Sequence, residues 1–111
     1  MVVGYHAVSM VDLAAGSRWK SAVSDTEVIV VRPAEGDHRL GCGGADMVAI
    51  DADGGGQRLD PDLAEPTLLG KRYTDETSGL EVLCTKGGDG VLTLDGARLV
   101  IKGAKPLPSS D

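Results

Sequence analysis

The sequence is poor in basic residues, in cysteine and in long apolar segments, and each shortage excludes a class of protein. Lysine and arginine number 11 against 17 aspartates and glutamates, which gives a formal net charge of −6. An acidic chain without a basic stripe is unsuited to nucleic acid or to an anionic membrane surface. No apolar run approaches the roughly 18 residues of a transmembrane helix, and residues 1–13 lack the pattern of a signal peptide. We therefore expect a cytoplasmic protein whose two cysteines, Cys42 and Cys84, stay reduced.

A long helical stripe of apolar residues is also missing, whereas strand-like runs recur. Residues 27–32 (EVIVVR) and 80–86 (LEVLCTK) are β-branched or apolar, and turn residues follow each run. The dipeptides at 43–44 and 95–96 favour tight hairpin turns because they accommodate positive φ angles. The sequence therefore predicts an all-β fold. For residues 11–15 it is compatible with either a strand or a single helical turn. The predicted core consists of Trp19, Val28, Val30, Leu40, Val48, Tyr73, Val82, Cys84, Leu92 and Leu99.

Two segments of the chain, residues 16–48 and 70–100, are copies of one sequence. Ten of the 31 paired positions are identical: Gly16/Gly70, Arg18/Arg72, Ser24/Ser78, Glu27/Glu81, Val28/Val82, Gly36/Gly90, Leu40/Leu92, Gly44/Gly96, Ala45/Ala97 and Val48/Val100. A copy of roughly 30 residues is too short to fold alone without a metal, a crosslink or a partner. We therefore expect the copies to form a pseudo-two-fold symmetric dimer inside one compact domain, residues 1–111. An acidic linker, 49–69, would join them, and an extended tail, 103–111, would follow.

The repeated unit resembles desulforedoxin and the N-terminal domain of desulfoferrodoxin. The resemblance rests on Gly16-Ser-Arg-Trp19 and Gly70-Lys-Arg-Tyr73 at the start, on the following strand and Gly-rich loop, and on Leu40-Gly-Cys-Gly-Gly-Ala-Asp-Met47 at the end. It covers nearly all of both copies. It implies a small rubredoxin-like β unit that forms a homodimer and holds one iron in four cysteine thiolates. A fused duplicate would reproduce that dimer in one chain.

Most of the iron ligands that the resemblance implies are missing from this chain. The ligand positions correspond to Ser21, Ser24, Cys42 and Gly43 in the first copy and to Asp75, Ser78, Leu94 and Asp95 in the second. One thiol remains of the eight expected, and hydroxyl or aliphatic side chains do not replace soft thiolate ligands. We therefore expect no cofactor, with one iron or zinc as the alternative. Covalent fusion of the copies would then replace the stability that a metal supplies to a small domain.

Cys42 is the candidate reactive thiol, because a Gly-rich turn would leave it accessible. His38 and Arg39 precede it closely and are the groups that would lower its pKa. His38 with Cys42 would also make half of a metal site, although further ligands are not evident. Cys84 lies in an apolar strand and is expected in the core.

Two further patterns are better explained without a ligand. Asp51, Asp53 and Asp62 have the spacing of a calcium loop, but the flanking helices are missing, so we expect a solvated linker. Arg18 and Arg72 occupy the same position in both copies and are candidates to clamp carboxylates. For this pair we favour a structural role or simple descent from one ancestor.

Together these features favour a non-catalytic accessory or binding module that contacts a partner protein or a small ligand. The first alternative is a redox or metal-handling protein that binds metal through Cys42 with His38 or Asp95. The second is a small enzyme with a pocket between the repeats and Cys42 as its nucleophile. We expect a monomeric pseudo-dimer, with further association left open.

Overall fold

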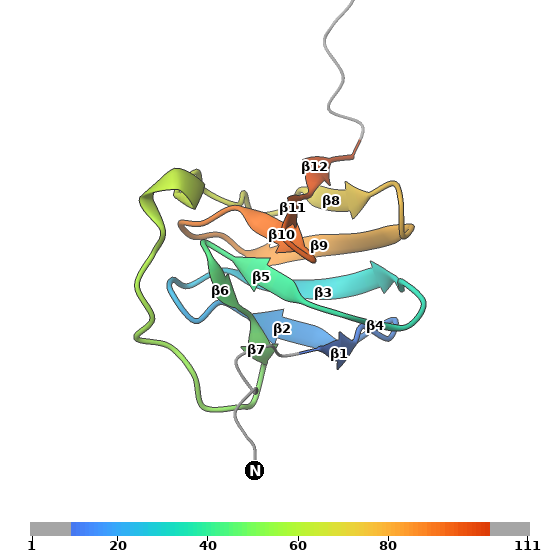
Figure 1. The fold of residues 1–111 in the computed structure, drawn as a ribbon, viewed down its shortest axis with the longest axis horizontal. Helices are drawn as coiled ribbons and strands as arrows, with labels where there is room; N and C mark the ends of the chain where they lie inside the picture. The colour runs from blue at the N-terminus through green and yellow to red at the C-terminus, as the bar shows by residue number, and fades with distance from the viewer. Residues whose placement is uncertain (1–9, 103–111) are drawn as a thin grey trace, which may run out of the picture.

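The structure is a computed structural model that describes residues 10–102, and its regular secondary structure is almost entirely short antiparallel strands (Figure 1). The prediction of an all-β fold is confirmed. The strands are β1 (Val11–Asp12), β2 (Arg18–Lys20), β3 (Glu27–Arg32), β4 (Asp37–His38), β5 (Leu40–Cys42), β6 (Ala45–Asp46), β7 (Val48–Ala49), β8 (Arg72–Asp75), β9 (Leu80–Lys86), β10 (Leu92–Leu94), β11 (Ala97–Arg98) and β12 (Val100–Ile101). A 3₁₀ helix, η2 (Pro61–Leu63), lies between β7 and β8.

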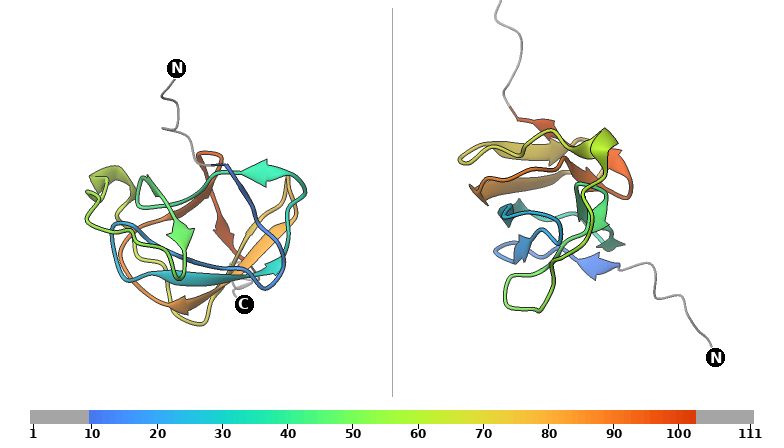
Figure 2. Two further views of the ribbon diagram at one scale, coloured as in Figure 1. Left: turned by 90° about the horizontal axis from the view of Figure 1, so that it is seen from below. Right: turned by 90° about the vertical axis from the view of Figure 1, so that its left-hand side faces the viewer.

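The strands form three sheets. A six-stranded sheet has the order β12-β8-β9-β3-β2-β7, a four-stranded sheet has the order β11-β10-β5-β6, and β1 pairs with β4 alone. The two larger sheets wrap around a common interior (Figure 2). Val28 and Val82 from the first and Leu40 and Leu92 from the second are each at most 1% exposed and belong to one apolar cluster. Burial of these side chains is the main force that holds the sheets together.

Strand pairs within the first repeat recur in the second at equivalent residues. Trp19 pairs with Val28 between β2 and β3, as Tyr73 pairs with Val82 between β8 and β9. The turns that follow β5 and β10 repeat in the same way, through the pairs β5–β6 and β10–β11. Each repeat therefore contributes the same set of strands to the two larger sheets.

Two further strand pairs join the repeats to one another. In the six-stranded sheet β3 pairs with β9, with Ile29 opposite Leu83, and these two residues are equivalent in the repeat. In the four-stranded sheet β5 pairs with β10, with Gly41 opposite Thr93, which are again equivalent positions. Each of the two larger sheets therefore takes strands from both repeats.

The predicted core is largely confirmed. Val28, Val30, Leu40, Tyr73, Val82, Cys84, Leu92 and Leu99 are buried. Trp19 and Val48 are only half-buried. Trp19 packs against the core from its edge and its indole N–H donates to the Ser17 hydroxyl at 3.0 Å. The prediction did not include Leu13, Leu80 and Leu94, which are buried as well.

The segments outside the repeats take part in the fold. Residues 11–12 form β1, so the strand alternative holds there. The linker 49–69 was expected to run over the surface, but Thr67 within it is 2% exposed and its hydroxyl donates to the Gly90 carbonyl at 2.6 Å. The predicted tail, 103–111, lies outside the described residues. Within residues 10–102 no helix is long and apolar enough to cross a membrane.

Candidate functional site

Around Cys42, three of the positions that the resemblance assigns to metal ligands come together. The Ser21 hydroxyl accepts hydrogen bonds from the amides of Val23 at 3.0 Å and Ser24 at 3.1 Å. The Ser24 hydroxyl in turn lies 3.1 Å from the Thr26 hydroxyl. Each hydroxyl thus has a partner within the turn between β2 and β3, which gives the turn a structural role.

The Cys42 side chain is fully buried, which corrects the expectation of an accessible thiol. Its exposed fraction is 0%, and the thiol donates to the Asp89 carbonyl, 3.8 Å from Sγ. Burial raises the pKa of the thiol, and the smaller effects of the Ser21, Thr26 and Ser24 hydroxyls lower it. A buried neutral thiol is a poor nucleophile and a poor metal ligand.

The fourth position of this set, Gly43, leaves no room for a ligand. A Cβ placed on it would lie 2.6 Å from Leu59 Cδ1 and 2.8 Å from Val23 Cγ2. Apolar side chains therefore fill the space where a fourth ligand would stand. The residues of the first repeat do not fit a four-thiolate iron site.

The corresponding positions of the second repeat are engaged in separate contacts. Leu94 is buried in the core at 3% exposure. The Asp75 carboxylate accepts the amide of Ser78 at 3.0 Å, which closes the turn between β8 and β9. Asp95 faces the other repeat. These four residues likewise do not fit an iron site, and within residues 10–102 no three acidic, histidine or cysteine side chains lie close enough to hold a metal ion.

His38 does not approach Cys42 but reaches Asp95 in the second repeat. Its Nδ1 lies 2.7 Å from Asp95 Oδ2, and its Nε2 lies 2.8 Å from the Glu35 carbonyl. Both partners only accept hydrogen bonds, so both ring nitrogens carry protons in this arrangement. The hydrogen bond to Asp95, followed by that to Glu35, raises the pKa of His38. The pair is a charged link between the repeats.

Arg72 was a candidate to clamp a carboxylate, and the carboxylate that it binds is Glu81 of the same chain. Glu81 is 3% exposed and lies 3.3 Å from Arg72 Nη1 and 2.8 Å from Lys102 Nζ. The hydrogen bond from Lys102 is the main cause that lowers the pKa of the Glu81 carboxyl. Arg18 has no ion pair within the described residues, so the two equivalent arginines differ in their roles.

The segment whose acidic residues have the spacing of a calcium loop, and for which a solvated linker was expected, is exposed over most of its length. Asp51 and Asp53 are exposed, and Asp62 lies in η2, where its amide donates to Asp60 Oδ1 at 2.9 Å. The segment thus agrees with a solvated linker up to residue 58, after which it packs against the repeats.

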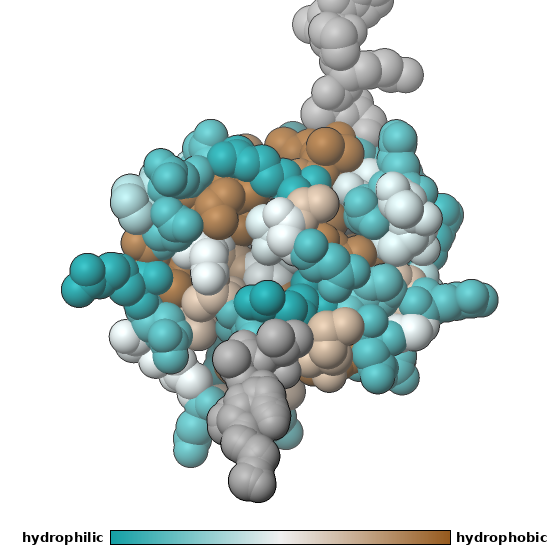
Figure 3. Space-filling view, in the orientation of Figure 1, coloured by the Kyte–Doolittle hydropathy of each residue, from teal (hydrophilic) through white to brown (hydrophobic). Residues whose placement is uncertain are grey.

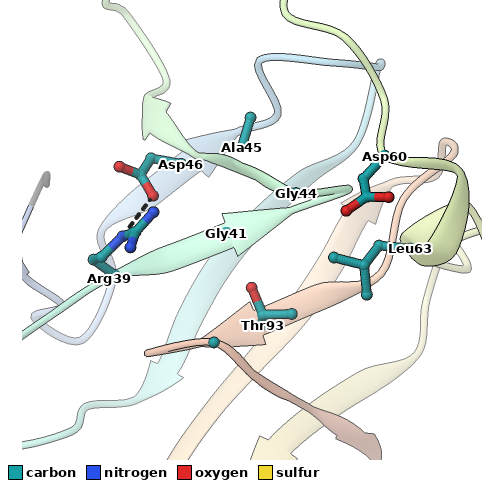
Figure 4. A pocket seen from close by; sticks show the side chains of 9 residues that line it. Arg39, Gly41, Gly44, Ala45, Asp46, Asp60, Leu63 and Thr93 are labelled. Atoms are coloured by element: carbon teal, nitrogen blue, oxygen red, sulfur yellow. Dashed lines mark hydrogen bonds and ion pairs between the residues drawn. The ribbon is translucent and has the colours of Figure 1, made fainter. Parts of the chain in front are cut away.

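A hollow lies where the two repeats meet the linker, and we call it the repeat cleft (Figure 4). Its inner part has a volume of about 200 Å³ and is lined by Arg39, Gly41, Gly44, Ala45, Asp46, Asp60, Leu63, Thr93 and Gly96. A neighbouring hollow of about 500 Å³, which we call the outer part, has Arg39, Gly44, Ala45 and Asp46 in its lining as well and extends along the linker past Asp53 and Gln57. Strands of both repeats and the linker therefore contribute to one open site.

Hydrogen bonds fix the polar groups of the repeat cleft in place. Arg39 Nε donates to Asp46 Oδ1 at 3.0 Å along one side, as Figure 4 shows. On the other side the Asp60 amide donates to the Gly43 carbonyl at 2.8 Å. Asp60 Oδ1 accepts the Asp62 amide, which leaves Oδ2 free to meet a ligand.

Sequence reasoning missed the residues of this cleft. Asp60 lies in a segment that was read as solvated linker, and Thr93 lies in a predicted strand. One feature of the sequence could have pointed to the cleft. Gly41 and Thr93 occupy equivalent positions of the repeats, but their side chains differ in size. A Cβ on Gly41 would lie 2.6 Å from Thr93 Oγ1, so the glycine is needed for the threonine to fit.

A separate apolar surface gathers near β12. Figure 3 shows apolar side chains at this edge of the six-stranded sheet, where Val100 is 54% exposed. A shallow hollow of about 240 Å³ lies beside it, lined in part by Leu68, Tyr73 and Ile101. This surface shares no lining residue with the repeat cleft.

Comparisons with protein-family models, with curated proteins and with solved structures give no match to this chain.

Proposed function

We propose that this protein is a non-catalytic binding module, a fused pair of desulforedoxin-like units without a metal, and that the repeat cleft is its ligand-binding surface. The observation that carries the proposal is the cleft itself, a hollow at the junction of both repeats and the linker with a few polar side chains in its lining. Binding sites are concave, few in number, and carry a small set of fixed polar groups. Arg39, Asp46 and Asp60 supply such groups here.

The chemistry of the lining favours binding over catalysis. Cys42, the candidate nucleophile, does not line the cleft and is fully buried. His38, the one histidine in the described residues, is held by Asp95 and Glu35 outside it. Catalysis by a nucleophile and a base requires the two groups to lie within hydrogen-bond reach of each other. Within residues 10–102 no cysteine, histidine or lysine lines the cleft to serve in such a pair, whereas recognition needs only fixed donors and acceptors.

Closing the cleft with one side chain tests the proposal. Ala45 lines both parts of the cleft, whereas Ala97 is its equivalent in the second repeat and lies on the exposed surface outside it. We expect small polar ligands from a fragment library to shift the amide resonances of residues 41–46 and 93–96. Ala45→Leu should abolish these shifts, and Ala97→Leu should preserve them.

The control pair separates binding from general damage to the fold. Both variants add the same side chain at equivalent positions, so they can be compared directly. Thermal unfolding of each variant shows whether the fold is kept. Ligands that bind Ala45→Leu as well as the parent protein would refute the cleft as the binding surface. Fragments that shift only resonances near β12 would move the proposed site to the apolar surface there.

A further inference from the structure

Thr93 presents a hydroxyl group without a partner to the repeat cleft. The residue is 8% exposed, and it projects from β10 toward the hollow (Figure 4). Every fully enclosed side-chain oxygen or nitrogen in residues 10–102 has a hydrogen-bond partner. The Thr93 hydroxyl opens into the cleft instead and has no partner among these residues. The hydroxyl can therefore exchange its hydrogen bond to water for one to a ligand in the cleft.

The carboxylates around the cleft exceed the cations. Asp46, Asp53 and Asp60 line its two parts, and Arg39 is the one basic residue of the lining. Arg39 is paired with Asp46, so its charge is already balanced. Asp60 has no basic partner among the described residues, and its position is fixed by two backbone hydrogen bonds. The cleft therefore offers one held carboxylate and one hydroxyl that can both accept hydrogen bonds.

An ammonium group matches this arrangement. It carries a positive charge and three N–H donors, and charge-assisted hydrogen bonds to a carboxylate are stronger than neutral ones. The inner cleft, at about 200 Å³, is smaller than the pockets that hold drug-sized molecules. It fits a short chain that ends in a primary amine. Such a chain occurs in small diamines and in the side chain of lysine.

We propose that the repeat cleft binds a primary ammonium group, with Asp60 Oδ2 and the Thr93 hydroxyl as its acceptors. This inference rests on the proposed binding role of the same cleft. The ammonium group enters the inner part between η2 and the paired strands β5 and β10. The remainder of the ligand lies in the outer part, along the linker.

Titration of the ¹⁵N-labelled protein with butane-1,4-diamine tests this proposal. Butane-1,4-diol has the same length and no charge, and it serves as the matched ligand control. We expect the diamine to shift the amides of residues 60 and 93 and the diol to leave them unchanged. Asp60→Asn and Thr93→Val should each weaken binding about 10- to 100-fold, the range for a lost hydrogen bond to a charged group.

Asp51→Asn is the matched protein control, because it removes the same charge from an exposed position outside the lining. It should bind the diamine as the parent does. Equal binding by Asp60→Asn, Thr93→Val and the parent would overturn the proposal and would indicate attraction to the acidic surface alone. Thermal unfolding of each variant confirms that it is folded.

Two further arms identify the source of the amine and separate this inference from the proposed function. The tripeptide Gly-Lys-Gly, compared with its Nε-acetylated form, shows whether a lysine side chain is accepted, as a protein partner would require. Binding of the diamine but not of the tripeptide supports a small-molecule ligand. If neither amine binds while neutral fragments still occupy the cleft, the ammonium proposal fails and the binding function stands. If no fragment occupies the cleft, both fail.

Discussion

The link between His38 and Asp95 predicts that the imidazole of His38 stays protonated above the usual pH. Both ring nitrogens face acceptors, a carboxylate at 2.7 Å and a carbonyl at 2.8 Å. Removing the proton from either nitrogen leaves one acceptor without a donor. The pKa of His38 is therefore raised, and Asp95→Asn, which removes the charge of the stronger partner, should lower it.

The sign of the effect on stability follows from proton linkage. A raised pKa of His38 contributes stability that is fully present below the unfolded value of about 6.5 and is lost as the pH rises through the folded value. The Asp95 carboxyl has a lowered pKa, caused first by the Arg39 amide and then by His38. Its contribution is present above about pH 3.9 and is lost in more acidic solution. The link therefore stabilises the fold most between about pH 4 and pH 6.5.

The size of the contribution is limited by exposure. The side chain of His38 is 17% exposed and that of Asp95 is 47% exposed, so water and salt screen their attraction. Ion pairs of this kind contribute between about 0.2 and 1 kcal/mol to the free energy of unfolding. We expect a loss within this range when the pH is raised from 6 to 9, and a smaller loss in 0.5 M salt.

The assay follows the imidazole C–H resonances of His38 by NMR as the pH is changed. His6→Gln removes the other histidine, so a single titration remains. Asn suits position 95 because the residue has φ 52°, a conformation that Asn tolerates well. A pKa of His38 at or below 6.5, or one that Asp95→Asn leaves unchanged, would refute the reasoning.

Three further predictions concern the fold. Lys102→Met removes the 2.8 Å partner of Glu81 and should lower the free energy of unfolding by about 1–2 kcal/mol at pH 7. Urea denaturation should show this loss shrinking as the pH falls below about 4.3, because the pKa of Glu81 is lowered and its contribution disappears on protonation. Leu94→Ala, at a site 3% exposed, should cost about 2–5 kcal/mol in the same assay. Cys42 and Cys84, both buried, should fail to react with a thiol reagent in the native protein and should react in urea; reaction of the native protein would contradict the burial described above.

Local signals in the sequence were sufficient to predict the strands and the tight turns. Gly43 and Gly44 have φ 65° and 94°, and the equivalent Asp95 and Gly96 have φ 52° and 88°. Both pairs occupy the hairpin turns that were predicted from their residue types. The two central strands were also predicted within a residue, because β-branched and apolar residues cluster in them. These features depend on neighbours along the chain, which a single sequence shows directly.

The surroundings of Cys42 and His38, which were predicted wrongly, depend on contacts between segments far apart in the sequence. Cys42 precedes two glycines, which suggested an exposed turn, but it is the last residue of β5. In the fold the loop around Gly90 of the other repeat covers it, so closely that a Cβ on Gly90 would lie 2.9 Å from Cys42 Sγ. His38 meets Asp95 across 57 positions of the chain. No period or motif of a single sequence indicates such an approach.

The repeat cleft takes its lining from both repeats and from the linker, so neither repeat contains the whole site. Gly44 and Gly96 are equivalent residues, and both line the inner cleft. A dimer of identical units would present two equal halves there. The linker occurs once, and it adds Asp60 to one side of the hollow, while Thr93 and Gly41 differ across the strand pair that joins the repeats. The acceptors proposed for an ammonium group thus come from the single linker and from a position at which the two repeats differ. Under the proposed function, the residues that differ between the repeats and the single linker, rather than the shared strand framework, set the ligand of the cleft.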